Sequence, residues 1–128
     1  MSPRSTRDLG RKHRGAAWAG LVVGLSTHDL AQVRASEVVP VDYIGFGPVL
    51  ATRSKALPEP CVGFSGLAEA CAAASRPVVA IGGLDVATAV QAARCGAAMV
   101  ATIGALVAAS VGEIHARVVA LAAALAAE

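Results

Sequence analysis

One stretch of the sequence, Arg76-Pro-Val-Val-Ala-Ile-Gly-Gly-Leu-Asp85, combines a short apolar run with two glycines and an acidic residue. An apolar run of this length that ends in Gly-Gly is typical of a strand buried on both faces. Asp85 is a good N-cap for a helix that follows the strand. Bare amides of Gly82 and Gly83 at the end of a parallel strand would favour a phosphate group. A tight strand-to-helix turn without a ligand explains the stretch equally well.

The same alternation of a strand and a helix occurs four times along the chain. The predicted strands cover residues 21–25, 41–46, 78–81 and 98–103. The predicted helices cover residues 30–39, 66–75 and 86–94, and a last helix begins at about residue 111. Four such repeats predict an α/β fold with a parallel sheet and right-handed crossovers.

The residues of chemical interest all follow predicted strands. They are Ser26 and His28, the segment Thr52-Arg-Ser-Lys55, the Gly82-Gly83 pair, and Gly104. The carboxyl ends of parallel strands meet at one edge of the sheet, where α/β folds bind their ligands. The hydroxyls and positive charges of residues 52–55 suit an anionic ligand. They belong to a loop over residues 49–63, and loops of that length are usually functional or disordered.

Each candidate also has a plainer interpretation. Ser26 could cap the following helix, and His28 could be a capping or supporting histidine. Lys55 could be a solvated lysine, which is the usual state of that residue. Gly104 could simply allow the last helix to pack closely. Asp8, taken alone, is expected to be a surface carboxylate.

Composition limits the classes of protein to consider. A chain of 128 residues is expected to form one domain, and its net charge of +2 is too small to indicate nucleic acid binding. Five of the eleven basic residues lie within residues 4–14, so residues 1–16 are predicted to be a separate basic segment or the remnant of a preceding βα unit. Residues 17–128 would then form the folded domain.

The cysteines and the apolar runs bear on location. The three cysteines show no CxxC spacing, which favours reduced thiols in the cytoplasm. The first twenty residues lack a secretory pattern, and the most apolar run, residues 118–127, is too short to span a bilayer. We therefore expect a cytoplasmic protein with no membrane partner.

Four motifs together resemble the thiamine phosphate synthase (thiamine-phosphate pyrophosphorylase) family. They are Gly24-Leu-Ser-Thr-His28, Asp42-Tyr-Ile-Gly-Phe-Gly-Pro48, Thr52-Arg-Ser-Lys55 and Ala80-Ile-Gly-Gly83. The resemblance covers about residues 24–109, and thiazole tautomerases are the sister group. It implies the C-terminal half of a TIM (β/α)₈ barrel, with four strands and the helices outside. The implied reaction joins hydroxymethylpyrimidine diphosphate to thiazole phosphate, gives thiamine phosphate and pyrophosphate, and uses Mg²⁺.

The resemblance also implies roles for individual residues. Ser26 would contact the pyrimidine diphosphate, Lys55 would neutralise the departing pyrophosphate, and Asp8 would be the counterpart of a magnesium-binding aspartate. The residues implied to bind the thiazole phosphate are Thr52, Arg53, Ser54, Gly82, Gly83, Ile103 and Gly104. The family often has serine where this chain has Gly104, so a hydroxyl is lost there while the backbone amide remains.

The length of the chain leaves alternatives open. An eight-stranded barrel needs about 200 residues or more, and this sequence contains four βα units. We therefore expect the isolated chain to be inactive and to associate with itself or with a complementary N-terminal half. A thiazole tautomerase-like enzyme that uses His28 as its acid–base residue is one alternative. A non-catalytic half-barrel that binds a phosphate ligand is another. The lysine of the Thr52-Arg-Ser-Lys55 motif favours the synthase.

Overall fold

The computed structural model describes residues 20–51 and 60–128. The strands are β1 (Gly24–Thr27), β2 (Tyr43–Phe46), β3 (Val78–Ile81) and β4 (Met99–Ala101). The helices are α2 (Leu30–Ala35), the short 3₁₀ helix η1 (Ser36–Val38), α3 (Gly63–Ala73), α4 (Val86–Arg94) and α5 (Val111–Ala126). The predicted boundary after residue 16, Asp8, and the segment 52–55 lie outside the described residues.

The four strands form one parallel sheet in the order β1-β2-β3-β4. Each strand therefore pairs with the next strand along the chain, as Ser26 with Gly45 and Val79 with Met99 show. This arrangement confirms the predicted α/β fold with parallel βα repeats and is consistent with part of a TIM-like barrel. In the described part of the chain, β1 and β4 each keep one edge without a neighbouring strand.

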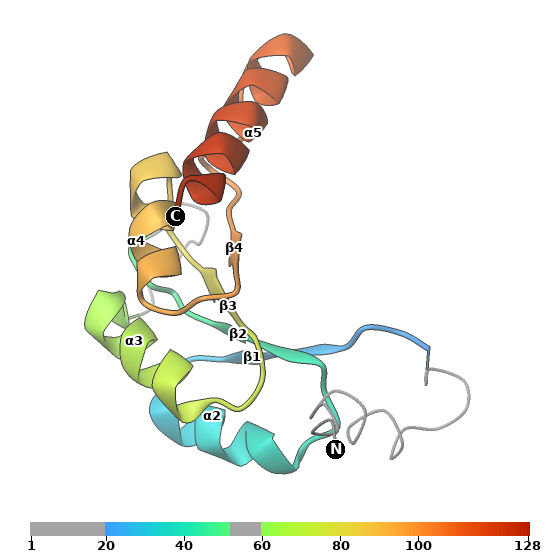
Figure 1. Cartoon of the computed structure of the whole chain (residues 1–128), viewed down its shortest axis with the longest axis vertical. Helices are drawn as coiled ribbons and strands as arrows, with labels where there is room; N and C mark the ends of the chain where they lie inside the picture. The colour runs from blue at the N-terminus through green and yellow to red at the C-terminus, as the bar shows by residue number, and fades with distance from the viewer. Residues whose placement is uncertain (1–19, 52–59) are drawn as a thin grey trace.

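The core lies between the sheet and the helices α2, α3 and α4, which cover the same side of it (Figure 1). Successive residues of a strand point to opposite faces, and on this side Ile44, Phe46, Val78 and Ala80 of the two central strands are buried, whereas Leu25 of β1 is 36% exposed. The largest apolar core residues are Val33, Val41, Ile44, Phe46, Val49, Leu67, Val78 and Leu84. Most are aliphatic, as the low aromatic content predicts.

The other side of the sheet has no helix over it in the described part of the chain (Figure 1). We call this side the open face; its strand residues are Gly24, Ser26, Tyr43, Gly45, Val79, Ile81, Met99 and Ala101. Met99 and Ile81 are 54% and 43% exposed although both are apolar. Within the described residues, β3 thus has one well-buried face rather than the two that its sequence predicts.

Helix α4 has the residues and bounds that the sequence predicts. Its N-cap is Asp85, whose Oδ1 accepts the Thr88 N–H at 2.9 Å, while the Asp85 N–H donates to Thr88 Oγ1 at 2.7 Å. These two bonds form a capping box. Chiefly because of the Thr88 backbone N–H, the pKa of Asp85 lies below its ordinary value. After the helix, Gly96 adopts a φ of +108°, as expected for a C′ glycine.

The first strand begins and ends later than predicted. Asp42 holds Val23 just before the strand: the Val23 N–H donates to Asp42 Oδ2 at 2.8 Å, and the Asp42 N–H donates to the Val23 carbonyl at 2.7 Å. Ladder pairing with β2 therefore covers residues 24–27 and includes Ser26, which the sequence places in the following turn. The cap of α2 is Asp29, which accepts the Gln32 N–H at 2.8 Å, so the interpretation of Ser26 as a helix cap is wrong.

Several other boundaries also differ from the prediction: β2 begins at Tyr43 rather than at residue 41, and the helix predicted over residues 30–39 is α2 followed by η1. Helix α3 begins at Gly63, before the predicted start at residue 66, because the N–H groups of Val62 and Gly63 donate to the carbonyls of Pro48 and Val49 at 2.8 and 2.9 Å. Strand β4 is shorter than predicted and ends at Ala101.

At the amino-terminal ends of the strands, Glu37, Ser75 and Arg76 hold two segments of the chain together. Glu37 accepts the Ser75 N–H at 3.0 Å and also the Ser75 hydroxyl. The Arg76 guanidinium donates to the backbone carbonyl of Glu37 at 3.2 Å and to that of Ser36. The hydrogen bonds from Ser75 lower the pKa of Glu37 below its ordinary value of 4.5. This cluster joins η1 to the start of β3.

Helix α5 extends away from the rest of the fold, with its C-terminal end beside α4 (Figure 1). An ion pair between Arg94 and Glu128, at 2.7 Å, joins the end of α4 to the end of the chain. Among the described residues, no helix is both long and apolar enough to cross a membrane.

Candidate functional site

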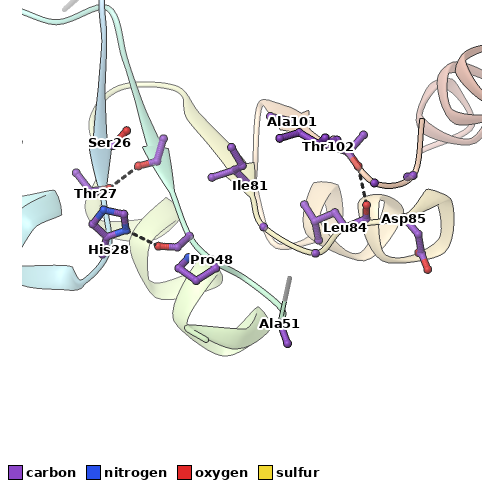
Figure 2. Close-up of a pocket in the computed structure, with 17 residues that line it drawn as sticks. Ser26, Thr27, His28, Pro48, Ala51, Ile81, Leu84, Asp85, Ala101 and Thr102 are labelled. Atoms are coloured by element: carbon purple, nitrogen blue, oxygen red, sulfur yellow. Dashed lines mark hydrogen bonds between the residues drawn. The ribbon is translucent and has the colours of Figure 1, made fainter. Parts of the chain in front are cut away.

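A pocket of about 530 Å³ lies at the carboxyl ends of all four strands (Figure 2). Ser26, Gly82, Gly83, Ile103 and Gly104, the described residues singled out from the sequence, all line it. His28 lines it as well. The structure thus brings together residues from the ends of β1, β3 and β4, at the edge of the sheet that the sequence predicts.

One wall of the pocket is formed by residues 47–51, which follow β2 and which we call the 47–51 segment. It begins with a cis peptide bond between Gly47 and Pro48. It then runs beside the end of β3, where the N–H groups of Val49 and Leu50 donate to the carbonyls of Ile81 and Gly82 at 3.0 and 3.1 Å. Two backbone hydrogen bonds therefore attach this segment to the Gly82-Gly83 turn.

Gly82 and Gly83 adopt φ values of +106° and +66°, which residues other than glycine rarely adopt. A Cβ atom on Gly82 would lie 2.6 Å from the Pro48 Cα, and one on Gly83 would lie 2.9 Å from the Leu50 carbonyl oxygen. Packing against the 47–51 segment thus already requires both glycines. The tight turn alone therefore explains both glycines, and phosphate binding at this turn stays a prediction.

The loop after β4 closes the pocket on the other side. The Thr102 hydroxyl donates to the Leu84 carbonyl at 2.8 Å and joins this loop to the Gly82-Gly83 turn (Figure 2). Gly104 is exposed, and a Cβ atom there would have no atom within 4 Å. Close packing of the last helix therefore does not explain this glycine. Sequence reasoning missed Thr102 because the strand predicted over residues 98–103 included it, whereas β4 ends at Ala101.

Ser26 and His28 line the pocket at its β1 end (Figure 2). Ser26 is exposed on the open face. His28 Nδ1 lies 2.9 Å from the Gly47 carbonyl oxygen, and the His28 N–H donates to Gln32 Oε1 at 2.7 Å. Between them, the buried Thr27 donates its hydroxyl to the Gly45 carbonyl at 2.7 Å. The ends of β1 and β2 are thus joined by side chains as well as by the strand ladder.

The charge of the pocket bears on its ligand. Asp85 is the one carboxylate among the described lining residues, and these include no lysine or arginine. Phosphate binding by this part of the site would therefore depend on backbone amides and hydroxyls. Ala51 lines the pocket immediately before Thr52 in the sequence, so the cations Arg53 and Lys55 follow a lining residue closely along the chain.

The same residues can be tested as a metal site. Within residues 20–51 and 60–128, no three His, Cys, Asp or Glu side chains are grouped so that they could hold a metal ion. The Asp85 carboxylate is already an acceptor for the first turn of α4. The described residues alone therefore do not fit Mg²⁺, for which several oxygen ligands are needed.

Comparisons with known proteins show which family this chain resembles in sequence and fold. The family model of thiamine monophosphate synthase matches residues 7–106. The thiamine-phosphate synthase of Anaeromyxobacter dehalogenans is 44% identical over 90 residues, which are 70% of this chain and 40% of that protein. The thiamine-phosphate synthase of Lactiplantibacillus plantarum is 45% identical over 87 residues, 67% of this chain and 40% of that protein.

A solved structure of a similarly named enzyme has a similar fold. Thiamine phosphate pyrophosphorylase from Pyrococcus furiosus superposes with a TM-score of 0.74 at 25% identity, over 87% of this chain and 52% of that one. The chain thus spans about 40% of the length of these two curated relatives and about half of the solved one. The family match covers most of the sequence, including the residues around the pocket, and the fold agrees with it. This chain belongs to the thiamine monophosphate synthase family.

Proposed function

We propose that this chain forms the phosphate-binding part of a thiamine phosphate synthase. The reaction is the condensation of hydroxymethylpyrimidine diphosphate with thiazole phosphate to thiamine phosphate and pyrophosphate. One observation carries the proposal: a pocket at the carboxyl ends of the strands collects Ser26, the Gly82-Gly83 turn and the Ile103-Gly104 pair. Family membership supports the choice of substrates.

The roles follow from position in the pocket. The loops after β3 and β4, which the Thr102–Leu84 hydrogen bond holds together, bind the thiazole phosphate through the backbone amides of residues 82–83 and 103–104. Ser26, at the other end of the pocket, contacts the pyrimidine diphosphate.

The remaining roles belong to residues outside the described ranges. Thr52, Arg53 and Ser54 complete the thiazole phosphate site, and Lys55 offsets the negative charge of the departing pyrophosphate. Asp8 contributes to Mg²⁺ binding. These roles are supported by the family resemblance alone, and we propose a cytoplasmic location on the same basis.

The open face supports a proposal about partners. Its exposed apolar side chains, and the edges of β1 and β4 that have no neighbouring strand among the described residues, would be covered if further βα units continued the sheet and closed it. Another copy of this chain or a complementary N-terminal half provides such units. A thiazole tautomerase activity is the second candidate function, because His28 lines the pocket. A non-catalytic half-barrel that binds phosphate remains the third.

A charge introduced at Gly104 tests the phosphate site without disturbing the fold. Gly104→Asp places a carboxylate at the pocket, and no atom lies within 4 Å of the new Cβ. Like-charge repulsion should weaken binding of thiazole phosphate and inorganic phosphate roughly tenfold, measured by calorimetry. Gly104→Ser should bind at least as tightly as the wild type, because it adds a hydroxyl beside the amide.

Gly112→Asp is the matched control. It makes the same substitution in the first turn of α5, outside the pocket lining and again with no atom within 4 Å of the new Cβ. The net charge of the chain changes equally in both variants. Equal affinities in the wild type and both aspartate variants would remove the loops after β3 and β4 from the proposed site.

A further inference from the structure

We propose that His28 is a positioning residue: its ring Nδ1–H holds the Gly47 carbonyl and thereby fixes the 47–51 segment, the wall of the pocket. Nδ1 lies 2.9 Å from the Gly47 oxygen (Figure 2). A carbonyl oxygen can only accept, so the hydrogen bond requires the proton to be on Nδ1. The role differs from the acid–base role that the tautomerase alternative gives to this histidine.

The peptide groups on both sides of the Gly47 Cα are held by Thr27 and His28, at the end of β1. The Gly47 N–H donates to the Thr27 carbonyl at 3.3 Å, and the Gly47 carbonyl accepts from His28. The His28 backbone is itself held, because its N–H donates to Gln32 Oε1 in α2 at 2.7 Å. The ring therefore connects an anchored point on β1 to the first residue of the 47–51 segment.

This tether reaches the phosphate loops through backbone contacts. Gly47 packs so closely on β3 that a Cβ atom there would lie 3.0 Å from the Ile81 Cγ2. Further along, Val49 and Leu50 donate to the carbonyls of Ile81 and Gly82. Movement of the segment would therefore shift the Gly82-Gly83 turn, whose amides are proposed to bind phosphate. The histidine would act on the ligand through these contacts rather than by transferring a proton.

Substitution of His28 by asparagine distinguishes the positioning role from the acid–base role. The Nδ2 of asparagine is the same number of bonds from Cα as Nδ1 of histidine, so it can donate to the Gly47 carbonyl, but it does not titrate. Alanine removes the donor completely. His28→Asn should therefore preserve a positioning role and abolish an acid–base role.

Amide hydrogen exchange on the 128-residue chain measures the tether directly. In His28→Ala, exchange at Gly47, Val49 and Leu50 should accelerate about two- to tenfold, the effect of losing one neutral hydrogen bond. In His28→Asn these amides should exchange within about twofold of the wild type. The Cys95 amide, which donates to Gln91 at the end of α4, should be unaffected in both variants.

Binding of inorganic phosphate, measured by calorimetry, should follow the same order: wild type and His28→Asn similar, and His28→Ala about two- to tenfold weaker. This binding comparison rests on the proposed function. If the wild type binds no phosphate, the proposed function fails, while the exchange rates still decide the role of His28.

Three results would overturn the inference. The first is unchanged exchange in His28→Ala, and the second is a His28→Asn variant as defective as His28→Ala. The third comes from the wild type alone and so does not depend on whether a variant folds. Nitrogen NMR of the imidazole at alkaline pH, where imidazoles are neutral, should show the proton on Nδ1; a proton on Nε2 would exclude the tether.

Discussion

A Cβ atom on Gly82 would lie 2.6 Å from the Cα of Pro48, and the φ of Gly82 is +106°. Gly82→Ala should therefore lower the free energy of unfolding by about 2–4 kcal/mol, from the strained φ and the displaced segment together. Denaturant unfolding at low protein concentration measures it. Gly104→Ala, which meets no atom within 4 Å, should change stability by less than about 1 kcal/mol. Equal effects of the two substitutions would contradict the packing described for residues 47–51.

Asp85→Asn should raise the affinity for phosphate. Asparagine is as good an N-cap as aspartate, so α4 should keep its stability, while the pocket loses the one carboxylate among its described lining residues. We expect an increase of about two- to fivefold at low ionic strength, which decreases as salt is added. Asp85→Ala, in contrast, should cost about 0.5–2 kcal/mol of stability through loss of the cap. An unchanged affinity in Asp85→Asn at low salt would place the phosphate away from α4.

Protonation of Glu37 should make the fold less stable in acid. The pKa of Glu37 is lowered in the folded chain, so its contribution is complete above the ordinary value of 4.5 and is lost as the pH falls through the lowered folded pKa. Glu37 is exposed, so the contribution should be about 1 kcal/mol or less.

Thermal melts above and below pH 4.5 measure this effect. Glu37→Gln should reduce the difference in melting temperature between the two conditions. Glu69→Gln, which removes an exposed carboxylate from the middle of α3, is the matched control. Identical pH profiles for Glu37→Gln and the wild type would show that the bonds to Ser75 do not contribute.

The open face should make the isolated chain self-associate. We expect dimers or aggregates in sedimentation, and a shift toward monomer in Met99→Lys, because Met99 is apolar, 54% exposed and outside the pocket lining. Val38→Lys adds the same charge at an apolar residue that is 90% exposed, but in η1 rather than on the open face, and should change nothing. A sharp wild-type monomer with a cooperative melt at high concentration would contradict this prediction.

Residues 1–128 alone should give no appreciable thiamine phosphate synthesis. Lys55 is proposed to offset part of the charge of a departing pyrophosphate, but the chain spans only about 40% of the length of its curated relatives, and one lost electrostatic partner typically costs a hundredfold or more in rate. Adding the N-terminal half of a full-length relative should restore turnover, and Lys55→Ala should remove it again.

Arg34→Ala is the control for charge in this experiment, because Arg34 is an exposed cation on α2 outside the pocket lining. Efficient turnover by the 128-residue chain would show that no other half is needed. A complemented barrel that works equally well with Lys55→Ala would show that Lys55 has a different role.

The sequence predicted most accurately the elements whose ends depend on local chemistry. Helix α4 agrees in both bounds because Asp85 caps its first turn and Gly96 follows its last. Strand β1 was misplaced because its start depends on Asp42, which is distant in the sequence but bonded to Val23. The start of α3 likewise depends on carbonyls of residues 48 and 49. Contacts of this kind leave no periodic pattern to detect.

The site was predicted as a set of positions rather than as a set of contacts. Placing Gly82 and Gly83 at the carboxyl edge needed only the strand pattern. Their packing against Pro48 and Leu50 could not be predicted, because it depends on how β2 and β3 pair. The same holds for the His28 hydrogen bond to Gly47, which joins residues that are adjacent only in the folded sheet.

The strand order also determines how the chain can fold. Paired residues are 19 positions apart between β1 and β2 (Gly24 and Tyr43) and 20 apart between β3 and β4 (Val79 and Met99). Between β2 and β3 the separation is 34 positions (Ile44 and Val78). Closing the longer loop costs about 0.5 kcal/mol more in chain entropy. We therefore expect the two βαβ units, β1-α2-β2 and β3-α4-β4, to form first, and the central pairing of β2 with β3, which joins the 47–51 segment to the Gly82-Gly83 turn, to form later.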